Sequence, residues 1–259
     1  MRSYLSRLQV KALFLSSAVC FSEAVRPFPS SSNPMTRQAL ELRGGSTPMK
    51  GAAKAVTTLG LAVGTTTALS TKTVLDKIGI ENMDPMGVLT TRRIGVSILC
   101  FSLVAYCLVF QNTSVSTAVG VSCIPTVVEI FKALFDGAHK ELGFPAEGQV
   151  VVGLVFAVFS YLFLNDSPLS KDALLKIYSG WLLSHGVLMG CFPSLALKTY
   201  GGMDAKPLMV LQSIVSLWGF SLLSLGALSG CLAAGMMTTK ALALSTLPFL
   251  SRFAVSKFV

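Results

Sequence analysis

Long apolar stretches alternate with short polar gaps from residue 52 to the end of the chain. One of them, residues 94–110, contains seventeen consecutive residues without a charge. A membrane-spanning helix needs about 20 mainly apolar residues, and a backbone in lipid must satisfy its polar groups internally. The apolar residues are continuous rather than alternating, which argues against a transmembrane barrel. We therefore predict an all-α fold, a polytopic membrane helix bundle with about seven transmembrane helices.

The seven predicted helices differ in how well they fit a bilayer. They occupy residues 52–71, 94–110, 115–135, 149–164, 173–191, 208–230 and 241–255. The first is the weakest because Ala, Thr and Gly supply much of it, and the fourth and seventh are short for a hydrocarbon core about 30 Å thick. We divide this region into a first membrane unit of about four helices (51–164) and a second of about three (165–259).

Composition and charge support this class and set an orientation. Only 13% of the 259 residues are charged, about half the share found in soluble domains, and the mean hydropathy is +0.67. The net charge of +9 does not indicate a nucleic-acid partner, because the basic residues form no cluster interleaved with aromatics. With seven helices, ten Lys and Arg residues, Arg92 and Arg93 among them, fall in the gaps on one side and three on the other. The positive-inside rule then places the richer side in the cytosol or stroma and the N-terminus across the membrane.

The first fifty residues indicate targeting. Three basic residues precede an apolar run at residues 12–21, and small residues follow it, which is the pattern of a secretory signal peptide. Residues 25–50 form a flexible leader rich in Ser, Pro and Arg, as transit peptides are. The two segments together resemble the bipartite plastid presequences of diatoms and related algae. We therefore expect a signal peptide at 1–24, entry through the secretory pathway, and residence in an endomembrane or plastid membrane.

An internal repeat is a further hypothesis. A shift of 120 residues aligns Met83-Asp84 with Met203-Asp204, and the order of apolar and polar segments recurs. Many membrane proteins are built from such repeats. The two copies would be inverted if each unit has three helices, and parallel if the fourth helix belongs to the first unit.

One segment of the second unit resembles a known class of membrane protein. A predicted helix ends at Phe192-Pro193, an amphiphilic turn follows to Gly201, and another helix begins after Asp204. This arrangement resembles uncharacterised small four-helix membrane proteins of the DoxX-like type. The resemblance implies a four-helix arrangement, in duplicate if the repeat holds, and it implies no chemistry.

Polar side chains inside spans are candidates for function, because lipid makes them costly. His185 could relay protons or hold a ligand, or it could donate one hydrogen bond to a neighbouring helix. Glu129 could bind a cation or a proton, but a pair with Lys132 along the helix, at the membrane interface, is the simpler interpretation. We expect Gln212 to form a hydrogen bond between helices, and Pro125 to kink its helix one turn before Glu129.

Three Gly-x-x-x-Gly spacings predict close helix packing. They are Gly60 and Gly64, Gly186 and Gly190, and Gly226 and Gly230. Each pair leaves two positions without a side chain on one helical face, so that a neighbouring backbone can approach closely. These faces favour a compact bundle and suggest a homo-oligomer.

No catalytic or cofactor-binding residues are predicted, and no metal site. The sequence holds no Cys-x-x-Cys pair and no Gly-rich phosphate loop, and we expect the cysteines in the spans to behave as small hydrophobes. The sequence therefore indicates a multi-pass integral membrane protein that is not an enzyme and has a structural or accessory role. The alternative is a small-solute or proton-coupled transporter that uses Glu129 and His185.

Overall fold

The computed structural model describes residues 47–80, 83–138, 146–166, 169–201 and 209–255. The predicted signal peptide (1–24), nearly all of the leader (25–50) and Met203-Asp204 lie outside these residues. All regular structure in the described part of the chain is helical, which confirms the predicted all-α class. The helices are α3 (Thr47–Leu69), α4 (Thr71–Lys77), α5 (Pro85–Val109), α6 (Val115–Phe135), α8 (Ala146–Leu164), α9 (Lys171–Cys191), α10 (Pro193–Gly201), α11 (Met209–Ala233) and α12 (Thr238–Val255).

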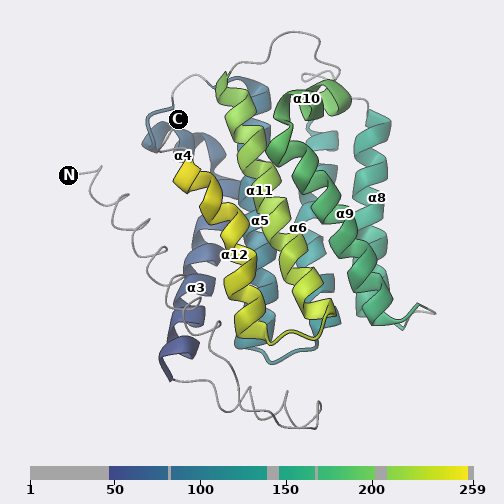
Figure 1. Ribbon diagram of the computed structural model, residues 1–259. Helices are drawn as coiled ribbons and strands as arrows, with labels where there is room; N and C mark the ends of the chain where they lie inside the picture. Colours follow the sequence, from purple (N-terminus) through teal and green to yellow (C-terminus); the bar gives the residue numbers. More distant parts are fainter. Residues whose placement is uncertain (1–46, 81–82, 139–145, 167–168, 202–208, 256–259) are drawn as a thin grey trace.

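The long helices run alternately in opposite directions and pack side by side as one bundle (Figure 1). Helices α3, α6, α9 and α12 run one way, and α5, α8 and α11 run the other. Helix α5 packs against α3, α6 and α11, while α11 also packs against α9 and α12, so α5 and α11 form the centre of the bundle. The short helices α4 and α10 lie at the same end, which we call the α10 end (Figure 1).

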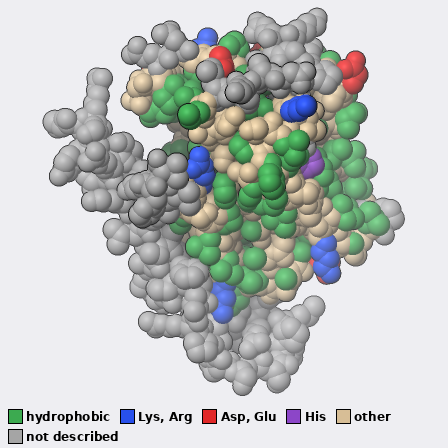
Figure 2. All heavy atoms as spheres, turned by 45° about the horizontal axis from the view of Figure 1, so that its top comes forward, with side chains coloured by type: hydrophobic (Ala, Val, Ile, Leu, Met, Phe, Trp, Pro, Cys, Tyr) green, Lys and Arg blue, Asp and Glu red, His purple; other side chains and the backbone are tan. Residues whose placement is uncertain are grey.

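Several helices have the length and composition of membrane spans. Among the described residues, α5, α6, α8 and α11 meet this criterion, and α9 meets it together with α10, to which it is joined through a bend of 112°. Helices α3 and α12 do not meet it, so the length and composition of the helices do not establish seven spans. Many large apolar side chains face outward, especially along α8, and charged side chains are sparse on the face in Figure 2. These features are typical of a protein embedded in a membrane.

Helix α5 begins nine residues before the predicted start at Ile94. The Asp84 side chain accepts a hydrogen bond from the Gly87 backbone N–H, and Pro85 occupies the first turn, where a missing N–H costs nothing. Arg92 and Arg93 therefore lie inside the helix, and the prediction that placed them in a polar gap is wrong. With both arginines removed, eight of the ten basic residues remain in the count for the richer side, against three on the other.

The bend between α9 and α10 has a local cause in the sequence. A proline disfavours helical geometry in the residue before it and cannot donate a backbone hydrogen bond. Phe192, which precedes Pro193, accordingly leaves the helical region with φ −128° and ψ 56°, and α9 ends at Cys191. Helix α10 then turns across the end of the bundle (Figure 1).

The helix pairs α3–α5 and α9–α11 pack through corresponding contacts. A Cβ added to Gly64 on α3 would lie 2.6 Å from the backbone nitrogen of Leu99 on α5. A Cβ added to Gly186 on α9 would lie 2.8 Å from the backbone nitrogen of Leu223 on α11. Both glycines and both leucines are separated by slightly more than 120 residues, and the order long helix, short helix, long helix, long helix recurs from α3 to α6 and from α9 to α12.

Candidate functional site

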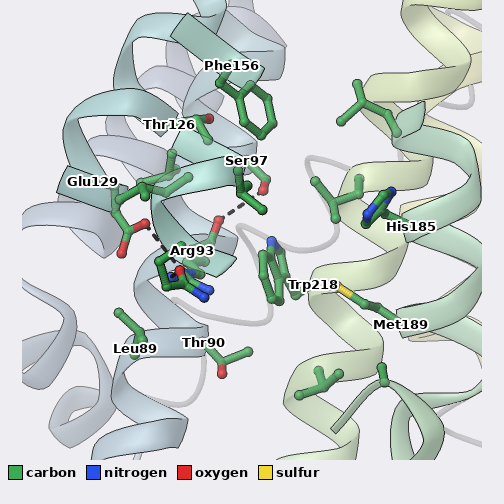
Figure 3. A pocket seen from close by; sticks show the side chains of 18 of the residues that line it. Leu89, Thr90, Arg93, Ser97, Thr126, Glu129, Phe156, His185, Met189 and Trp218 are labelled. Atoms are coloured by element: carbon green, nitrogen blue, oxygen red, sulfur yellow. Dashed lines mark hydrogen bonds and ion pairs between the residues drawn. The ribbon is translucent and has the colours of Figure 1, made fainter. Parts of the chain in front are cut away.

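A cavity of about 130 Å³ lies among α5, α6, α8, α9, α10 and α11. Its wall is formed by the parts of these helices nearest the α10 end, and most of the lining side chains are apolar (Figure 3). An apolar cavity of about 150 Å³ in another protein binds benzene. The cavity is therefore large enough for a molecule of about that size, inside the helix bundle.

An ion pair forms the polar part of the cavity wall. Arg93 on α5 and Glu129 on α6 point toward each other, with 3.4 Å between Nε and Oε2 (Figure 3). Both side chains are almost completely buried, with 11% and 6% of their surface exposed. Arg93 lies about 12 Å along α5 from Pro85, at 1.5 Å per residue. The pair therefore stands well inside the bundle, where its two charges cancel.

Arg93 is also held by α8 and α11. Its Nη2 atom donates a hydrogen bond of 2.6 Å to Oε1 of Gln149 on α8. Its guanidinium carbon lies 5.4 Å from the ring centroid of Trp218 on α11, a distance at which a cation is attracted to the face of an indole. Four helices thus position one guanidinium group at the cavity wall.

Two polar atoms of this cluster have no hydrogen-bond partner among the described residues. They are Nε of Arg93, whose N–H is a donor, and Oε1 of Glu129, which is an acceptor. A buried polar atom without a partner costs about 1–3 kcal/mol. A bound molecule that carries an acceptor and a donor close together would satisfy both atoms.

His185 lines the same cavity from α9. Its Nδ1 atom is 2.8 Å from the carbonyl oxygen of Trp181, one turn earlier on the same helix. Because a carbonyl only accepts hydrogen bonds, Nδ1 carries the proton in this arrangement. The imidazole also packs edge-on against the Trp181 ring, with 4.8 Å between centroids. The prediction considered a bond to a neighbouring helix, whereas the bond at Nδ1 stays within α9.

The predicted pair between Glu129 and Lys132 is wrong. Lys132 binds Asp136 instead, with 2.5 Å between Nζ and Oδ2, and both side chains are about half exposed. Lys132 and Asp136 are four residues apart on one exposed face, while Glu129 turns inward toward Arg93. Gln212 is half-buried on α11 and does not line the cavity. Helix α6 continues through Pro125 to Phe135.

The six glycines of the Gly-x-x-x-Gly spacings lie at helix contacts within the chain. On α3, Gly60 and Gly64 face Ser102 and Leu99 of α5. The other four lie in the contact between α9 and α11: Gly186 and Gly190 face Leu223 and Phe220, and Gly226 and Gly230 face Leu182 and Ser179. Helices of the same chain thus cover all three faces. The homo-oligomer that these faces suggested stays a prediction.

Sequence reasoning missed Arg93, Gln149 and Trp218 as members of the site. Arg93 was assigned to a gap, although Asp84-Pro85 is a helix-start signal that places it inside α5. Nothing in the sequence singles out Trp218 or Gln149, because their role depends on which helices meet. Within the described residues, no three His, Cys, Asp or Glu side chains are grouped so that they could hold a metal ion.

No protein-family model, no curated protein and no solved structure matches this chain. The resemblances to DoxX-like membrane proteins and to plastid presequences therefore stay predictions. The function has to be argued from the cavity and its side chains.

Proposed function

We propose that the protein is a membrane carrier for a small solute with an apolar body and a polar, hydrogen-bonding head group. The observation that carries this proposal is the buried Arg93–Glu129 pair, with one unpartnered donor and one unpartnered acceptor at the wall of a cavity. Charged side chains within membrane segments are costly, and where they occur they generally mark a binding site or pathway. Glu129 and His185 line this one cavity, as the transporter hypothesis requires.

A purely structural role accounts for these features less well. A buried ion pair contributes little net stability, because desolvation of the two charges offsets their attraction. A pair kept for structure would also be expected to have its polar atoms satisfied by the surrounding protein. A ligand site is usually mostly apolar, with a few well-placed polar groups. The cavity has this composition, because its wall is mainly apolar and the two atoms without a hydrogen-bond partner lie at one side of it.

The chain provides its own reporter of binding. Its two tryptophans, Trp181 and Trp218, both line the cavity. Titration of the full chain in lipid nanodiscs with butyrate, butyramide and butanol should give a saturable change in tryptophan fluorescence for at least one probe. Val152→Phe places a larger side chain at the cavity wall and should abolish the change. The neighbouring Val151 is 59% exposed on the same helix, so Val151→Phe is the matched control and should bind normally.

Transport is tested in sealed vesicles that contain the reconstituted full chain. Radiolabelled pyruvate and lactamide are suitable probes because both cross a bare bilayer slowly. At least one of them should enter wild-type vesicles faster than vesicles with the Val152→Phe variant. Equal entry of both probes into the two kinds of vesicle, or the absence of any saturable fluorescence change, would refute the carrier function.

We further propose that α3, α5, α6, α8, α9, α11 and α12 all cross the membrane, with the α10 end in the cytosol or stroma. The alternating helix directions and the basic residues near the α10 end support this topology. Cysteines introduced at the exposed positions Gly51, Lys72 and Asn112 test it in sealed vesicles with an impermeant maleimide. Gly51→Cys and Asn112→Cys should react from one side and Lys72→Cys from the other. Reaction of Gly51→Cys and Lys72→Cys from the same side would show that α3 does not cross.

We also propose that α3–α6 and α9–α12 are two copies of one unit, joined by α8. The equivalent contacts of Gly64 and Gly186 support this repeat. Since α3 and α9 run in the same direction, the copies would be parallel, the arrangement expected if the fourth helix belongs to the first unit.

A further inference from the structure

We infer that the solute is a small monocarboxylate, and that the cavity takes it up together with one proton. This inference rests on the proposed carrier function and names its substrate class. It follows from the two unpartnered atoms of the ion pair, from the charge of the cavity wall and from the size of the cavity.

The unpartnered atoms define the head group. Arg93 presents the N–H of Nε, which lies 3.4 Å from Oε2 of Glu129 without donating a hydrogen bond to it, and Glu129 presents the lone pairs of Oε1. A ligand that satisfies both needs an acceptor and a donor on neighbouring atoms. A carboxylic acid has this arrangement, because its carbonyl oxygen can accept from Nε–H while its hydroxyl donates to Oε1. A primary amide has the same arrangement without a titratable proton, and it therefore serves as the control ligand.

The charge balance of the site determines the protonation state in which the acid binds. The site formed by the protein side chains is neutral, since the positive charge of Arg93 is matched by the negative charge of Glu129. A carboxylate alone would add an uncompensated negative charge to a buried site, which is costly. One proton taken up with the anion keeps the site neutral and lies between an oxygen of the ligand and Oε1 of Glu129. The O–H bond of this proton is the only covalent bond that changes, and the charge of the site is the same before and after binding.

The other titratable groups around Glu129 do not provide a second positive charge at the wall. The lining residues from α8, α10 and α11 include no charged side chain, and α9 contributes only His185. Lys132 on α6 is exposed and paired with Asp136. Among the described lining residues, Arg93 is thus the single permanent cation. This arrangement suits one carboxylate and disfavours a dicarboxylate, whose second charge would face apolar side chains.

The rest of the wall suits a short hydrocarbon body. Phe156, Leu182, Met189 and Leu222 are buried and line the cavity. A volume of about 130 Å³ is close to that of a cavity known to hold benzene, which has six heavy atoms. Butyrate and butyramide, which also have six each, therefore match the cavity in size and differ from each other only in the head group.

The proton is the feature to test. The full chain in nanodiscs is titrated with butyrate in weakly buffered solution, with tryptophan fluorescence reporting binding and a pH-sensitive dye reporting protons. We expect one proton taken up for each butyrate bound between pH 6.5 and 8.5, and none with butyramide. By linkage, the Kd for butyrate should rise tenfold for each pH unit over this range, while the Kd for butyramide stays constant. Pyruvate uptake into vesicles should follow an inside-alkaline pH gradient and ignore an imposed membrane potential.

Variants locate the proton. Glu129→Gln removes the negative charge, so butyrate should bind to Arg93 without a proton and its Kd should no longer depend on pH. Asp136→Asn removes an exposed carboxylate from the same helix and should leave the tenfold dependence intact. If Glu129→Gln does not fold, the proton count of the wild-type chain still decides the question. His185 is the other titratable group at the cavity wall, and butyrate binding without proton uptake in His185→Asn would overturn the assignment to the carboxyl pair.

The outcomes separate the two proposals. Binding of butyramide as tight as that of butyrate throughout the pH range, or butyrate binding without proton uptake, would overturn the monocarboxylate inference and leave the carrier function standing. Failure of all of the probes to bind, or to enter vesicles faster than with Val152→Phe, would overturn the carrier function itself.

Discussion

Breaking the buried ion pair from one side should destabilise the protein more than removing both charges. At the 3.4 Å between Nε of Arg93 and Oε2 of Glu129, the attraction is about 5 kcal/mol for an effective dielectric constant near 20. Glu129→Gln leaves the guanidinium buried without its counterion, and such a loss typically costs about 3–5 kcal/mol. Arginine cannot lose its proton, so Arg93 has no means of neutralising itself.

The double variant Arg93→Met with Glu129→Met removes both charges and keeps comparable side-chain lengths. Its main remaining cost is Gln149, whose side-chain oxygen loses the hydrogen bond from Arg93, about 1–3 kcal/mol. The double variant should therefore be more stable than Glu129→Gln, by about 2 kcal/mol if both costs are near the middle of their ranges. For a chain of this size, each kcal/mol corresponds to about 2–4 °C in Tm.

Thermal unfolding in one detergent, followed by tryptophan fluorescence, measures these differences. The exposed pair Lys132–Asp136 provides the control, because Asp136→Asn breaks an ion pair on the same helix that is worth about 0–1 kcal/mol. A Glu129→Gln variant as stable as the double variant, or as Asp136→Asn, would refute the view that the pair is buried and electrostatically coupled.

Two further predictions concern helix packing and helix ends, and thermal unfolding of the detergent-solubilised chain measures both. Gly186→Ala places a methyl group against the backbone of α11, and Gly64→Ala places one against the backbone of α5, so each should lower the free energy of unfolding by about 1–3 kcal/mol. Gly180→Ala faces open space and should leave the free energy of unfolding unchanged or raise it by up to about 1 kcal/mol. Lys171 donates hydrogen bonds to carbonyl groups at the end of α8, so Lys171→Met should lower the free energy of unfolding by about 1–3 kcal/mol. Lys176 is exposed, so the control variant Lys176→Met should change the free energy of unfolding by less than about 0.5 kcal/mol. Equal effects within either set of variants would contradict the contacts described.

The sequence predicted the helices well and their first residues less well. Apolar stretches long enough for a span are visible without knowledge of any partner, so the existence and order of the long helices could be predicted. The start of α5 was missed because the predicted helix began only after the last charged residue before the apolar stretch, Arg93. Asp84-Pro85 determines the true start, through a side-chain cap and a proline in the first turn. Local chemistry at the helix end thus outweighed the boundary suggested by hydropathy.

The glycine spacings show what sequence can and cannot supply. They identified faces without side chains, and all six glycines lie at contacts between helices. The partner of each face could not be read from the sequence, because many of the long helices in the described residues carry apolar side chains on exposed faces as well as on buried ones. The faces of Gly186 and Gly226 meet each other's helix within one chain, where the sequence alone allowed a second copy instead.

The partner of Glu129 could have been predicted in part by comparing how far each charged residue lies along its helix. Helices α5 and α6 are antiparallel neighbours joined at one end by a short connection. Arg93 lies about 24 Å along α5 from that connection and Glu129 about 21 Å along α6, at 1.5 Å per residue, so their side chains reach the same level of the bundle. Arg92 reaches nearly the same level but points about 100° away, because that is the rotation per residue in a helix. The position along the helix therefore indicates an arginine as the partner of Glu129. The packing of α5 against α6 and α11, together with the hydrogen bond to Gln149 of α8, determines that it is Arg93.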